Sequence, residues 1–453
     1  MKNYDAIIIG SGMGGIAAAM MLAHKGKKVV VFEKNTLLGG RLSSYKKDGF
    51  TLDIGVHVIS RGEKGPVVEC LSRVGIENPI KFIKIRPLVS FNGKPFVFPH
   101  DLKDMVAEKD FNSLMKFMSD VMTFTAEQIS ELDQITLKEL LLRYTDNEVI
   151  HTVVSRIGSI YCGIPAWVEA AGEFVRCMSW EAKARASGYP EGGCVAITNA
   201  FVEGIKKFDG EVINNSPVEK IIVENGRAVG VIVGGKTYKA EMIISNADIR
   251  NTVLNLIDPG AFAAEYVEYV KSLKYAWAGP VIRIALDQKI TDLKMLAQFG
   301  EVGQEQYFDK IRRGVMPEQL NLFLVVPSNF SPAVAPEGKQ LINVATPIPT
   351  DTSQEVIDRL QEAMLDTAEK YIPDLRKHIM WTDFMSIKSC AALAGEDGCT
   401  IGIAQSPGQV GTKRPKIKTP LEGLYIVGCD CGGAGVGIEL AANSSLEFID
   451  NYC

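Results

Sequence analysis

Hydrophobic residues gather in short runs near the start of the chain, and polar residues separate these runs. Asp5–Ile9 is apolar and rich in β-branched residues, which is typical of a buried parallel strand. Ile16–Ala23 predicts a tightly packed helix, and Lys28–Phe32 predicts a second strand. A strand, a helix and a strand in this order predict a βαβ unit.

Glycines fill the turn between the first strand and the helix. Gly10, Gly12 and Gly15 follow the G-x-G-x-x-G spacing, and Glu33 ends the second strand. Such glycines allow a tight turn, a close approach of backbone to a pyrophosphate, and close packing of helix on strand. The helix N-terminus attracts phosphates, and a carboxylate accepts hydrogen bonds from ribose hydroxyls. We therefore expect a dinucleotide site rather than a glycine-rich turn that binds nothing.

The spacing of apolar residues changes along the rest of the chain. From Leu102 to about Trp180 they recur every three or four residues, which predicts an all-helical insertion. Leu88–Phe91 and Lys94–Phe98 flank Asn92-Gly93, which predicts a hairpin. Three later runs fit one antiparallel sheet, and a helix is expected over Thr352–Tyr371; the runs are Val281–Leu286, Leu322–Val326 and Leu341–Ala345.

Two further stretches return to the pattern of the first strands. Ser216–Val223 and Ala228–Val233 predict a meander, after which Ala240–Ala247 is expected to re-enter the parallel sheet. Leu424–Val427 predicts a last strand, and a glycine-rich loop leads to a helix that begins near Ile438. Segments from both ends of the chain are thus expected to meet in one sheet.

Length and composition limit the classes of protein. A chain of 453 residues should form two or more domains. A net charge of −5 gives no sign of a nucleic-acid partner. Nine cysteines without a C-x-x-C pair indicate reduced thiols in the cytoplasm. We expect no signal peptide and no spanning segment, although peripheral contact with a membrane stays open, and the oligomeric state is not indicated.

Further motifs carry a resemblance to a known family. Leu38–Ser44 contains G-G-R-x-x-S, and Gly49–His57 contains G-F-x-x-D-x-G. Tyr189–Cys194 contains Y-P-x-G-G. With the first βαβ unit, these segments resemble the FAD-binding flavoproteins of the amine oxidase and phytoene desaturase superfamily, most closely the carotenoid (phytoene) desaturase branch. The last loop reads Cys431-Gly432-Gly433 where that branch usually carries Thr-His-Pro, so the resemblance implies FAD binding rather than one particular desaturation.

The resemblance implies an α/β fold, in which a Rossmann-like FAD-binding domain carries an inserted substrate domain of antiparallel sheet plus helices. The FAD-binding domain is expected to comprise residues 1–75, 191–260 and 401–453, and the substrate domain residues 76–190, mainly helical, and 261–400, mainly sheet. The implied activity is an FAD-dependent oxidoreductase acting on C–C bonds of an apolar isoprenoid- or polyene-like substrate, by desaturation, saturation or isomerisation. An amine-oxidase-like or other small-molecule flavin oxidoreductase is the alternative. A prenyl-binding chaperone of the Rab escort kind is disfavoured, because the cofactor segments are intact.

The resemblance also implies a set of site residues. Val218 would pair with adenine through its backbone, and Asp430 would hold ribityl or pyrophosphate oxygens. His57 is the candidate proton donor, weighed against a structural histidine. Cys429 and Cys431 are read as buried thiols rather than a redox pair, and no metal site is expected. The predicted cofactor-binding residues are Gly10, Gly12, Gly14, Gly15, Glu33, Lys34, Gly39, Gly40, Arg41, Leu42, Gly55, Val56, His57, Val218, Asn246, Gly428, Asp430, Gly437 and Ile438.

Overall fold

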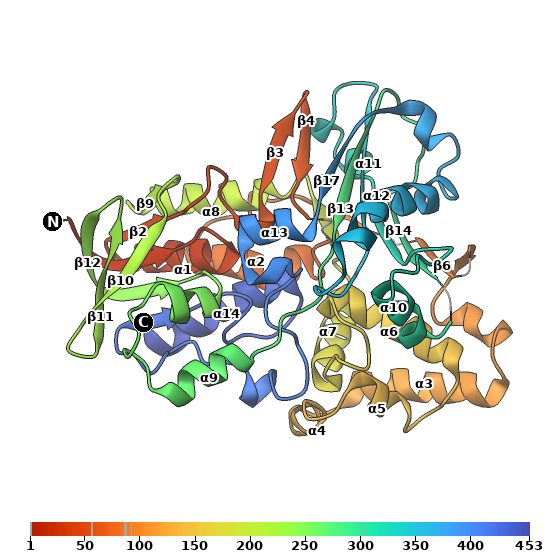
Figure 1. Cartoon of the computed structure of the whole chain (residues 1–453), viewed down its shortest axis with the longest axis horizontal. Coiled ribbons are helices and arrows are strands. Elements are labelled where there is room, and N and C mark those ends of the chain that lie inside the picture. Colours follow the sequence, from red (N-terminus) through yellow and green to blue (C-terminus); the bar gives the residue numbers. More distant parts are fainter. Residues whose placement is uncertain (1, 56–57, 86–87, 92, 301) are drawn as a thin grey trace.

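Two seven-stranded sheets lie toward opposite ends of the molecule (Figure 1). The computed structural model describes residues 2–55, 58–85, 88–91, 93–300 and 302–453. The first sheet has strands from the beginning, the middle and the end of the chain, whereas the second is built mainly from residues after 280. A mixed α/β fold was predicted, and it is confirmed.

The first sheet combines a parallel part with a meander. β1 lies between β12 and β2, and Ile7 pairs with Ile243 on one side and Val30 on the other. β9 and β18 extend the parallel part, while β10, β11 and β12 are antiparallel neighbours. The predicted βαβ unit and the re-entering strand are therefore confirmed. The strands are β1 (Lys2–Ile9), β2 (Val29–Phe32), β9 (Glu211–Ile213), β10 (Val218–Glu224), β11 (Arg227–Val233), β12 (Lys236–Ser245) and β18 (Leu424–Ile426).

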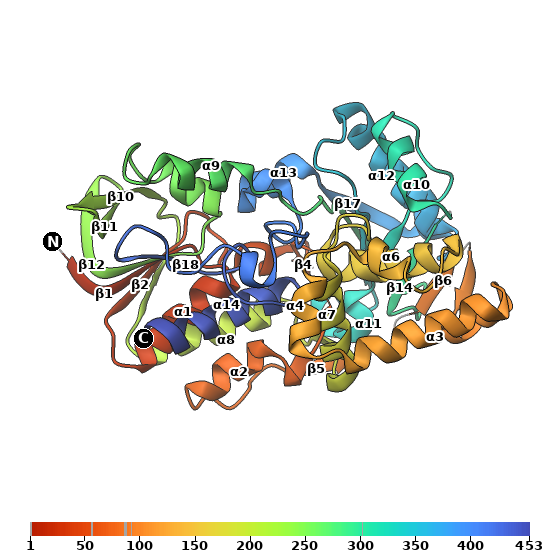
Figure 2. The same ribbon diagram turned by 90° about the horizontal axis from the view of Figure 1, so that it is seen from below.

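Three helices pack together against this sheet (Figure 2). α1 (Met13–His24) contacts both α8 (Val195–Lys207) and α14 (Gly437–Tyr452). Every residue from Met13 to Ala23 is buried, because the sheet covers one side of α1 and the two helices cover others. A helix that is apolar on all sides is stable only when it is surrounded in this way.

The second sheet contains the three strands that the sequence predicts and joins them to the hairpin. β13, β16 and β15 are antiparallel neighbours, and β6 pairs with β7 around the expected turn. β14 and β17 were not predicted, because polar residues such as Gln298 and Asp383 interrupt their apolar pattern. In sheet order the strands are β17 (Ile379–Met385), β13 (Val281–Leu286), β16 (Gln340–Ala345), β15 (Leu322–Val325), β14 (Met295–Phe299), β6 (Leu88–Phe91) and β7 (Lys94–Phe96).

A group of helices packs beside the β6–β7 edge of the second sheet (Figures 1 and 2). Their core includes Leu114, Phe117 and Phe174 together with Phe91 and Phe96 from the hairpin. The predicted helical insertion is confirmed. These helices are α3 (Glu108–Thr123), α4 (Ala126–Leu132), α5 (Leu137–Leu141), α6 (Glu148–Cys162) and α7 (Ala171–Ala184). None of the helices in the described part of the chain is long and apolar enough to cross a membrane.

The remaining elements cover the two sheets or connect them. β3 pairs with β4 and β5 with β8, in two small antiparallel sheets. The predicted domain boundaries stay a prediction, because strand pairing shows only which segments share a sheet. The other elements are β3 (Ser44–Lys47), β4 (Phe50–Asp53), β5 (Phe82–Lys84), β8 (Gly188–Pro190), α2 (Pro66–Arg73), α9 (Ala264–Ser272), α10 (Gln304–Arg312), α11 (Pro327–Phe330), α12 (Gln354–Glu369) and α13 (Ile387–Ala394).

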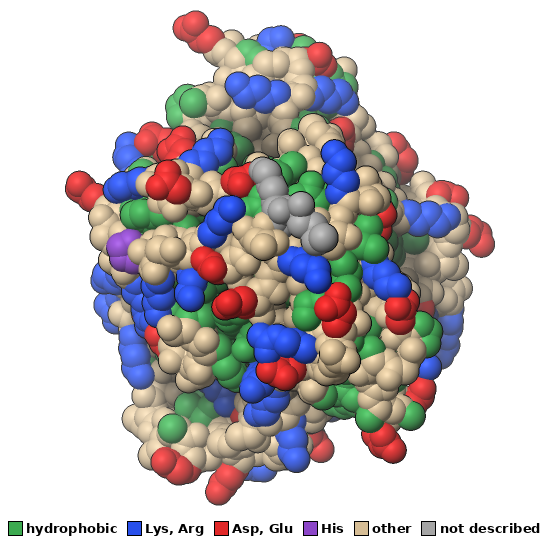
Figure 3. Space-filling view, turned by 90° about the vertical axis from the view of Figure 1, so that its left-hand side faces the viewer, with side chains coloured by type: hydrophobic (Ala, Val, Ile, Leu, Met, Phe, Trp, Pro, Cys, Tyr) green, Lys and Arg blue, Asp and Glu red, His purple; other side chains and the backbone are tan. Residues whose placement is uncertain are grey.

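The outer face at the first sheet carries positive and negative side chains side by side (Figure 3). Exposed ion pairs occur in this part of the molecule, for example Arg227 with Glu422 and Lys239 with Glu224. Such interspersed charge gives no extended basic surface on the face shown.

Candidate active site

A cavity of about 1530 Å³ runs between the two sheets. The residues that follow the carboxyl ends of β1, β2, β12 and β18 line one part of it: Gly10, Glu33, Asn246 and Val427. In a parallel sheet these ends meet at one edge, which is where open α/β sheets bind their ligands. The predicted dinucleotide site therefore coincides with a real cavity.

The glycine turn after β1 is in close contact with neighbouring backbone and with the Asn246 side chain. Gly10 has a φ of +93°, which favours glycine. A Cβ on Gly12 would lie 2.5 Å from Asn246 Oδ1, one on Gly14 would lie 2.8 Å from the Cα of Gly428, and one on Gly15 would lie 2.2 Å from the Gly10 carbonyl oxygen. Gly10 and Gly12 line the cavity, whereas Gly14 and Gly15 lie against protein backbone and Gly428 lies against the Asn246 side chain.

Glu33 organises the glycine turn as well as facing the cavity. Its Oε2 accepts hydrogen bonds from the backbone N of Ser11 (2.9 Å) and from Ser11 Oγ (2.7 Å), and its Oε1 accepts one from Asn35 N (2.8 Å). Ser11 Oγ in turn accepts from the N–H of Gly39 at 3.0 Å. A carboxylate has about four acceptor positions, so one stays open to a ligand hydroxyl. The sequence did not single out Ser11.

Asn246 joins the ends of two strands beside the glycines. Its backbone N donates to the Ile9 carbonyl at 2.7 Å, and its Nδ2 donates to the Val427 carbonyl at 2.9 Å. Its Oδ1 is buried without a hydrogen-bond partner among the described residues. This acceptor next to Gly12 is a place where a bound ligand or water can donate a hydrogen bond.

The segment 39–42 forms a second backbone approach to the cavity. Gly39 and Gly40 have φ values of +104° and +58°, and a Cβ on Gly40 would lie 3.7 Å from the Gly12 Cα. Arg41 Nη1 donates to the Cys399 carbonyl (3.2 Å) and its Nη2 to the Ile401 carbonyl (2.8 Å). Arg41 and Leu42 line the cavity. The hydrogen bonds of Arg41 therefore join the segment around Cys399 and Ile401 to this side of the cavity.

The buried Asp53 connects two of the sequence motifs, the G-F-x-x-D-x-G and Y-P-x-G-G segments, through hydrogen bonds. Its carboxylate accepts hydrogen bonds from Ser44 Oγ (2.7 Å), Tyr189 Oη (2.6 Å) and Cys194 N (2.9 Å). The fully buried Arg283 donates from Nε to the Asp53 carbonyl at 2.6 Å. The G-F-x-x-D-x-G and Y-P-x-G-G segments are thus bound to each other. Spacing alone gave no signal for this link or for Arg283.

Two predicted residues fall outside the described part of the chain. Gly55 lines the cavity, but Val56 and His57 are not among the described residues. The role of His57 as a proton donor therefore stays a prediction. Val218 also lines the cavity, and so does Lys34, whose Nζ donates to the Ala392 carbonyl at 3.3 Å. Pairing of Val218 backbone with an adenine stays a prediction too.

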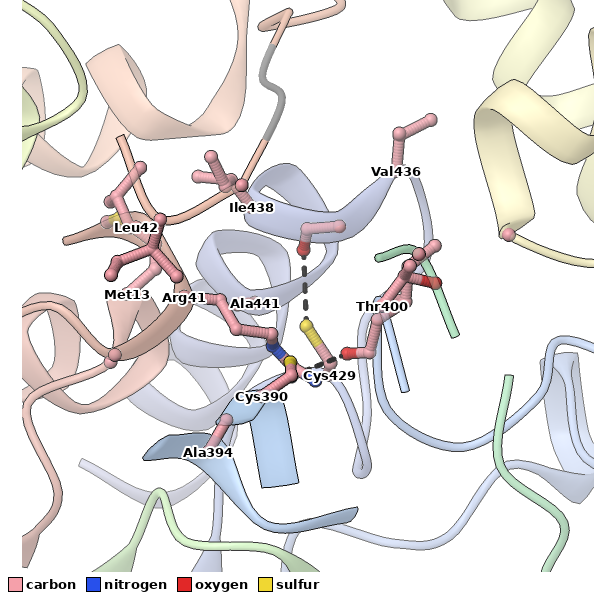
Figure 4. Close-up of a pocket in the computed structure, with 18 of the residues that line it drawn as sticks. Met13, Arg41, Leu42, Cys390, Ala394, Thr400, Cys429, Val436, Ile438 and Ala441 are labelled. Carbon is pink, nitrogen blue, oxygen red and sulfur yellow. Dashed lines mark hydrogen bonds between the residues drawn. The ribbon is translucent and has the colours of Figure 1, made fainter. Parts of the chain in front are cut away.

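The loop before α14 forms another wall of the cavity (Figure 4). Asp430 lines the cavity, and its two carboxylate oxygens accept from Ile249 N (2.9 Å) and Ile403 N (3.0 Å). Burial raises the pKa of the Asp430 carboxyl, and the carboxylate of Asp248 adds to this rise. The carboxylate therefore fastens two backbone segments, in addition to any contact with a ligand.

The N-terminus of α14 faces the same space. Gly437 and Ile438 line the cavity, and a helix N-terminus favours negative charge. Cys429 Sγ donates to the Gly437 carbonyl at 3.3 Å, as Figure 4 shows. Neither Cys429 nor Cys431 forms a disulfide bond with another described residue. In the part of the chain that the structure describes, no group of three or more His, Cys, Asp or Glu side chains is arranged to hold a metal ion.

The other part of the cavity is apolar and lies between α6 and the second sheet. Its walls come from β5, β6, β14 and β15 and from α6. Of the described cations that line this part, Lys84 and Arg185 are exposed, whereas Arg156 of α6 is buried. Arg156 is not among the residues predicted from the sequence, although a lone arginine inside an apolar helical run is a signal. The apolar residues are Ile85, Leu88, Val89, Phe96, Phe98, Ile157, Ile160, Met295, Ala297, Phe299 and Phe323.

Comparison with known proteins identifies the class to which this site belongs. A family model described as flavin containing amine oxidoreductase matches residues 13–447, so the chain belongs to this family of flavin-dependent oxidoreductases. Among its relatives, the chloroplastic prolycopene isomerase of Daucus carota is 27% identical over 96% of this chain and 78% of its own. A 4,4'-diapophytoene desaturase of Methylomonas sp. is 25% identical over 82% of this chain and 80% of its own.

The solved structures agree on the fold. An oxidoreductase from Methanosarcina mazei superposes with a TM-score of 0.76 at 21% identity, covering 100% of both chains. At this identity the likeness shows the fold alone. The family membership establishes a flavin cofactor and an oxidoreductase, as the motifs predicted.

Proposed function

We propose that this protein is an FAD-dependent oxidoreductase that acts on carbon–carbon bonds of an apolar, isoprenoid- or polyene-like substrate. The observation that carries the proposal is the single cavity that joins the glycine turn to an apolar compartment. Such a cavity accommodates a dinucleotide at one end and a hydrocarbon chain at the other. The bound flavin supplies two-electron redox chemistry, while the protein supplies orientation and a dry environment.

The cofactor end fits FAD rather than a smaller flavin. Gly10, Gly12 and Gly40 bring backbone to the cavity wall, where a pyrophosphate needs close approach. Glu33 presents a carboxylate at the position suited to ribose hydroxyls. Flavin released by acid from the purified protein should therefore be FAD by chromatography. FMN, or a colourless protein that takes up no flavin, would contradict this assignment.

The substrate end fits an apolar chain. Burial of apolar surface is worth about 25 cal/mol per Å², so a long hydrocarbon gains more from these walls than a small amine does. The names of the relatives, a prolycopene isomerase and a diapophytoene desaturase, point to polyenes for those proteins. We infer the same class of substrate here, with desaturation, saturation and isomerisation all open as the reaction.

Anaerobic flavin spectroscopy tests the substrate class. Polyenes or long acyl chains should reduce the oxidised flavin, reoxidise the reduced flavin, or shift its absorption bands. Putrescine, used as a small polar amine, should leave the spectrum unchanged. If putrescine bleaches the flavin rapidly and the apolar compounds do nothing, the amine-oxidase-like alternative replaces the proposal.

Apolar substrates must enter from a lipid phase, which makes a peripheral membrane contact part of the proposal. Leu88, Val97 and Ile160 line the cavity and are also exposed, by 42%, 59% and 37%. They mark an apolar mouth, and exposed apolar clusters of this kind favour membrane surfaces. We expect V97E with L88E to weaken sedimentation with phosphatidylcholine vesicles. L142E, at an exposed leucine away from the cavity, is the matched control.

A further inference from the structure

Among the described residues, three arginines are almost completely buried, and one of them differs from the others. Arg283 donates to the Asp53 carbonyl and pairs with Asp383 at 3.0 Å. Arg414 donates from Nε to the Gly432 carbonyl at 2.6 Å. Arg156 is 3% exposed, and its Nε and Nη1 have no hydrogen-bond partner among the described residues. It forms no ion pair with any described residue, and it lines the cavity.

The surroundings of Arg156 make its positive charge energetically unfavourable. Ile157 and Val89 line the same compartment, and the guanidinium lies 5.9 Å from the centroid of the Phe299 ring, a cation–π contact that offsets only part of the cost of burying the charge. Burial lowers the pKa of Arg156 to about 10, so the side chain is still protonated at neutral pH. A buried cation without a partner destabilises a protein unless a ligand or another group supplies the missing negative charge. The position therefore indicates a ligand group rather than a structural role.

We propose that Arg156 binds a carboxylate at the end of the substrate, so that the substrate is an apolar chain with one acidic terminus. This inference rests on the proposed function for the reacting part of the chain. A guanidinium matches a carboxylate through two parallel hydrogen bonds. One buried cation matches one negative charge, whereas a diphosphate needs several. Lys84 and Arg185, the other cations among the described residues that line this compartment, are exposed.

Helix geometry gives this contact a second role. Gly163 follows α6 directly, and a Cβ there would lie 2.5 Å from Thr400 Oγ1. Thr400 belongs to the cofactor end of the cavity, where it lies near Cys429 and Val436 (Figure 4). Arg156 precedes Gly163 by seven residues, which corresponds to about 10 Å along a helix. A carboxylate held at Arg156 thus sets which bond of the chain reaches the cofactor.

Fluorescence titration with cis-parinaric acid and its methyl ester tests the proposal. Both carry the same conjugated chain, but only the acid carries the charge. We expect the wild-type protein to bind the acid roughly tenfold or more tightly than the ester, as hydrogen bonds to charged groups imply. Arg156→Gln should remove this preference and leave ester binding unchanged. Arg156→Lys should keep part of the preference for the acid, because the positive charge remains although the two parallel hydrogen bonds of the guanidinium are lost. Arg185→Gln, at the exposed arginine of the same cavity, should keep all of it.

Stability and flavin content separate the possible outcomes. Without ligand, Arg156→Gln should melt no lower than the wild type, since an unpaired buried charge is removed. A lower melting temperature with loss of both ligands would mean a structural arginine and overturn the proposal. Equal binding of acid and ester by a wild-type protein that carries FAD would also overturn it, while the proposed function stands. A wild-type protein without FAD that still prefers the acid would overturn the proposed function alone.

Discussion

At the cofactor end, the buried carboxylates of Glu33 and Asp430 accept hydrogen bonds from backbone N–H groups, whereas Nε and Nη1 of the buried Arg156 in α6 have no partner among the described residues. Glu169, next to α6, is also buried, and no nitrogen or hydroxyl donor among the described residues bonds its carboxylate. In the first region the protein itself bonds the buried charged groups, and the unbonded Asn246 Oδ1 is a neutral acceptor. The second region holds charge that the protein does not neutralise.

This difference separates two ways of building a binding site. The cofactor end is preorganised, because its carboxylates are fixed by hydrogen bonds and its glycines by close contacts with backbone and with the Asn246 side chain. The α6 end keeps an unsatisfied group, which costs stability and gains specificity when the right ligand arrives. Proteins commonly accept such a cost at functional sites. Substitutions in the two regions should therefore have opposite effects on the stability of the ligand-free protein.

The largest effect is expected for Gly15→Ala at the cofactor end. The new Cβ would lie 2.2 Å from the Gly10 carbonyl oxygen, and backbone cannot move aside as a flexible side chain can. We expect a loss of about 3 kcal/mol or more, the upper part of the range for overpacked cores. Urea unfolding of the FAD-free protein measures it without the ligand. Gly26→Ala is the control, since its surroundings are open and only its φ of +79° opposes a side chain, at roughly 1–2 kcal/mol. Equal stability of the two variants would show that the close packing of α1 on β1 is not required.

The second effect is a pH dependence that arises at Glu169. Burial, opposed by a hydrogen bond from Cys162 and aided by the Glu173 carboxylate, raises the pKa of Glu169 from 4.5 to about 8. Between these values the folded protein binds more protons than the unfolded chain, so the free energy of unfolding falls as the pH rises through this window. Glu169→Gln cannot ionise and should remove this slope.

Melting temperatures at about pH 5 and about pH 9 check the Glu169 prediction. The gain of Glu169→Gln over the wild type should be greater at the higher pH. Glu131→Gln, at an exposed position of α4, should leave the pH dependence unchanged. A gain that is the same at both pH values would mean that Glu169 stays ionised in the folded protein.

The third effect concerns Glu33 and FAD affinity. Glu33→Ala removes an acceptor for ribose hydroxyls and also the acceptor that orients Ser11. Hydrogen bonds to charged groups are worth about 1.5–3 kcal/mol, so FAD affinity should fall roughly ten- to hundred-fold. Ser11→Ala isolates the second contribution and should cost less, because the backbone hydrogen bond from Ser11 to Glu33 remains. Titration of FAD into apoprotein measures both, and unchanged affinity in Glu33→Ala would place the ribose elsewhere.

Much of the cofactor end could be predicted from the sequence, because its signals are local. The turn from Gly10 to Gly15, the acid at Glu33 and the glycine loop before Ile438 each lie within a few residues of the strand that positions them. Parallel strands then bring these local pieces to one edge. Periodicity likewise predicted the helices from Leu102 onward and three strands of the second sheet.

The links between distant segments could not be predicted from a single sequence. Asp53 contacts Tyr189 and Cys194, and Arg283 reaches the Asp53 carbonyl, across separations that no motif encodes. β14 and β17 were missed because polar residues interrupt their apolar pattern: Gln298 of β14 is buried only by tertiary packing, and β17 is partly exposed along its length. Arg156 became a candidate only when its surroundings were known. In this molecule, motifs within short segments could be predicted from the sequence, whereas hydrogen bonds between polar groups of distant segments could not.

The smallest effect is expected for Lys34→Ala at the rim of the cofactor end. Lys34 was predicted to bind the cofactor, and it lines the cavity, but its side chain is exposed and donates to the Ala392 carbonyl at 3.3 Å. Exposed charges contribute about 0.2–1 kcal/mol and are screened by salt. FAD affinity should therefore fall less than about fivefold, and the loss should shrink further at high ionic strength. Titration of apoprotein with FAD at low and high salt measures both quantities. A loss of FAD affinity as large as that of Glu33→Ala, and insensitive to salt, would mean that Lys34 becomes buried against the cofactor. The contrast between the fixed buried residues and the weakly interacting exposed residues of the cofactor end would then fail at Lys34.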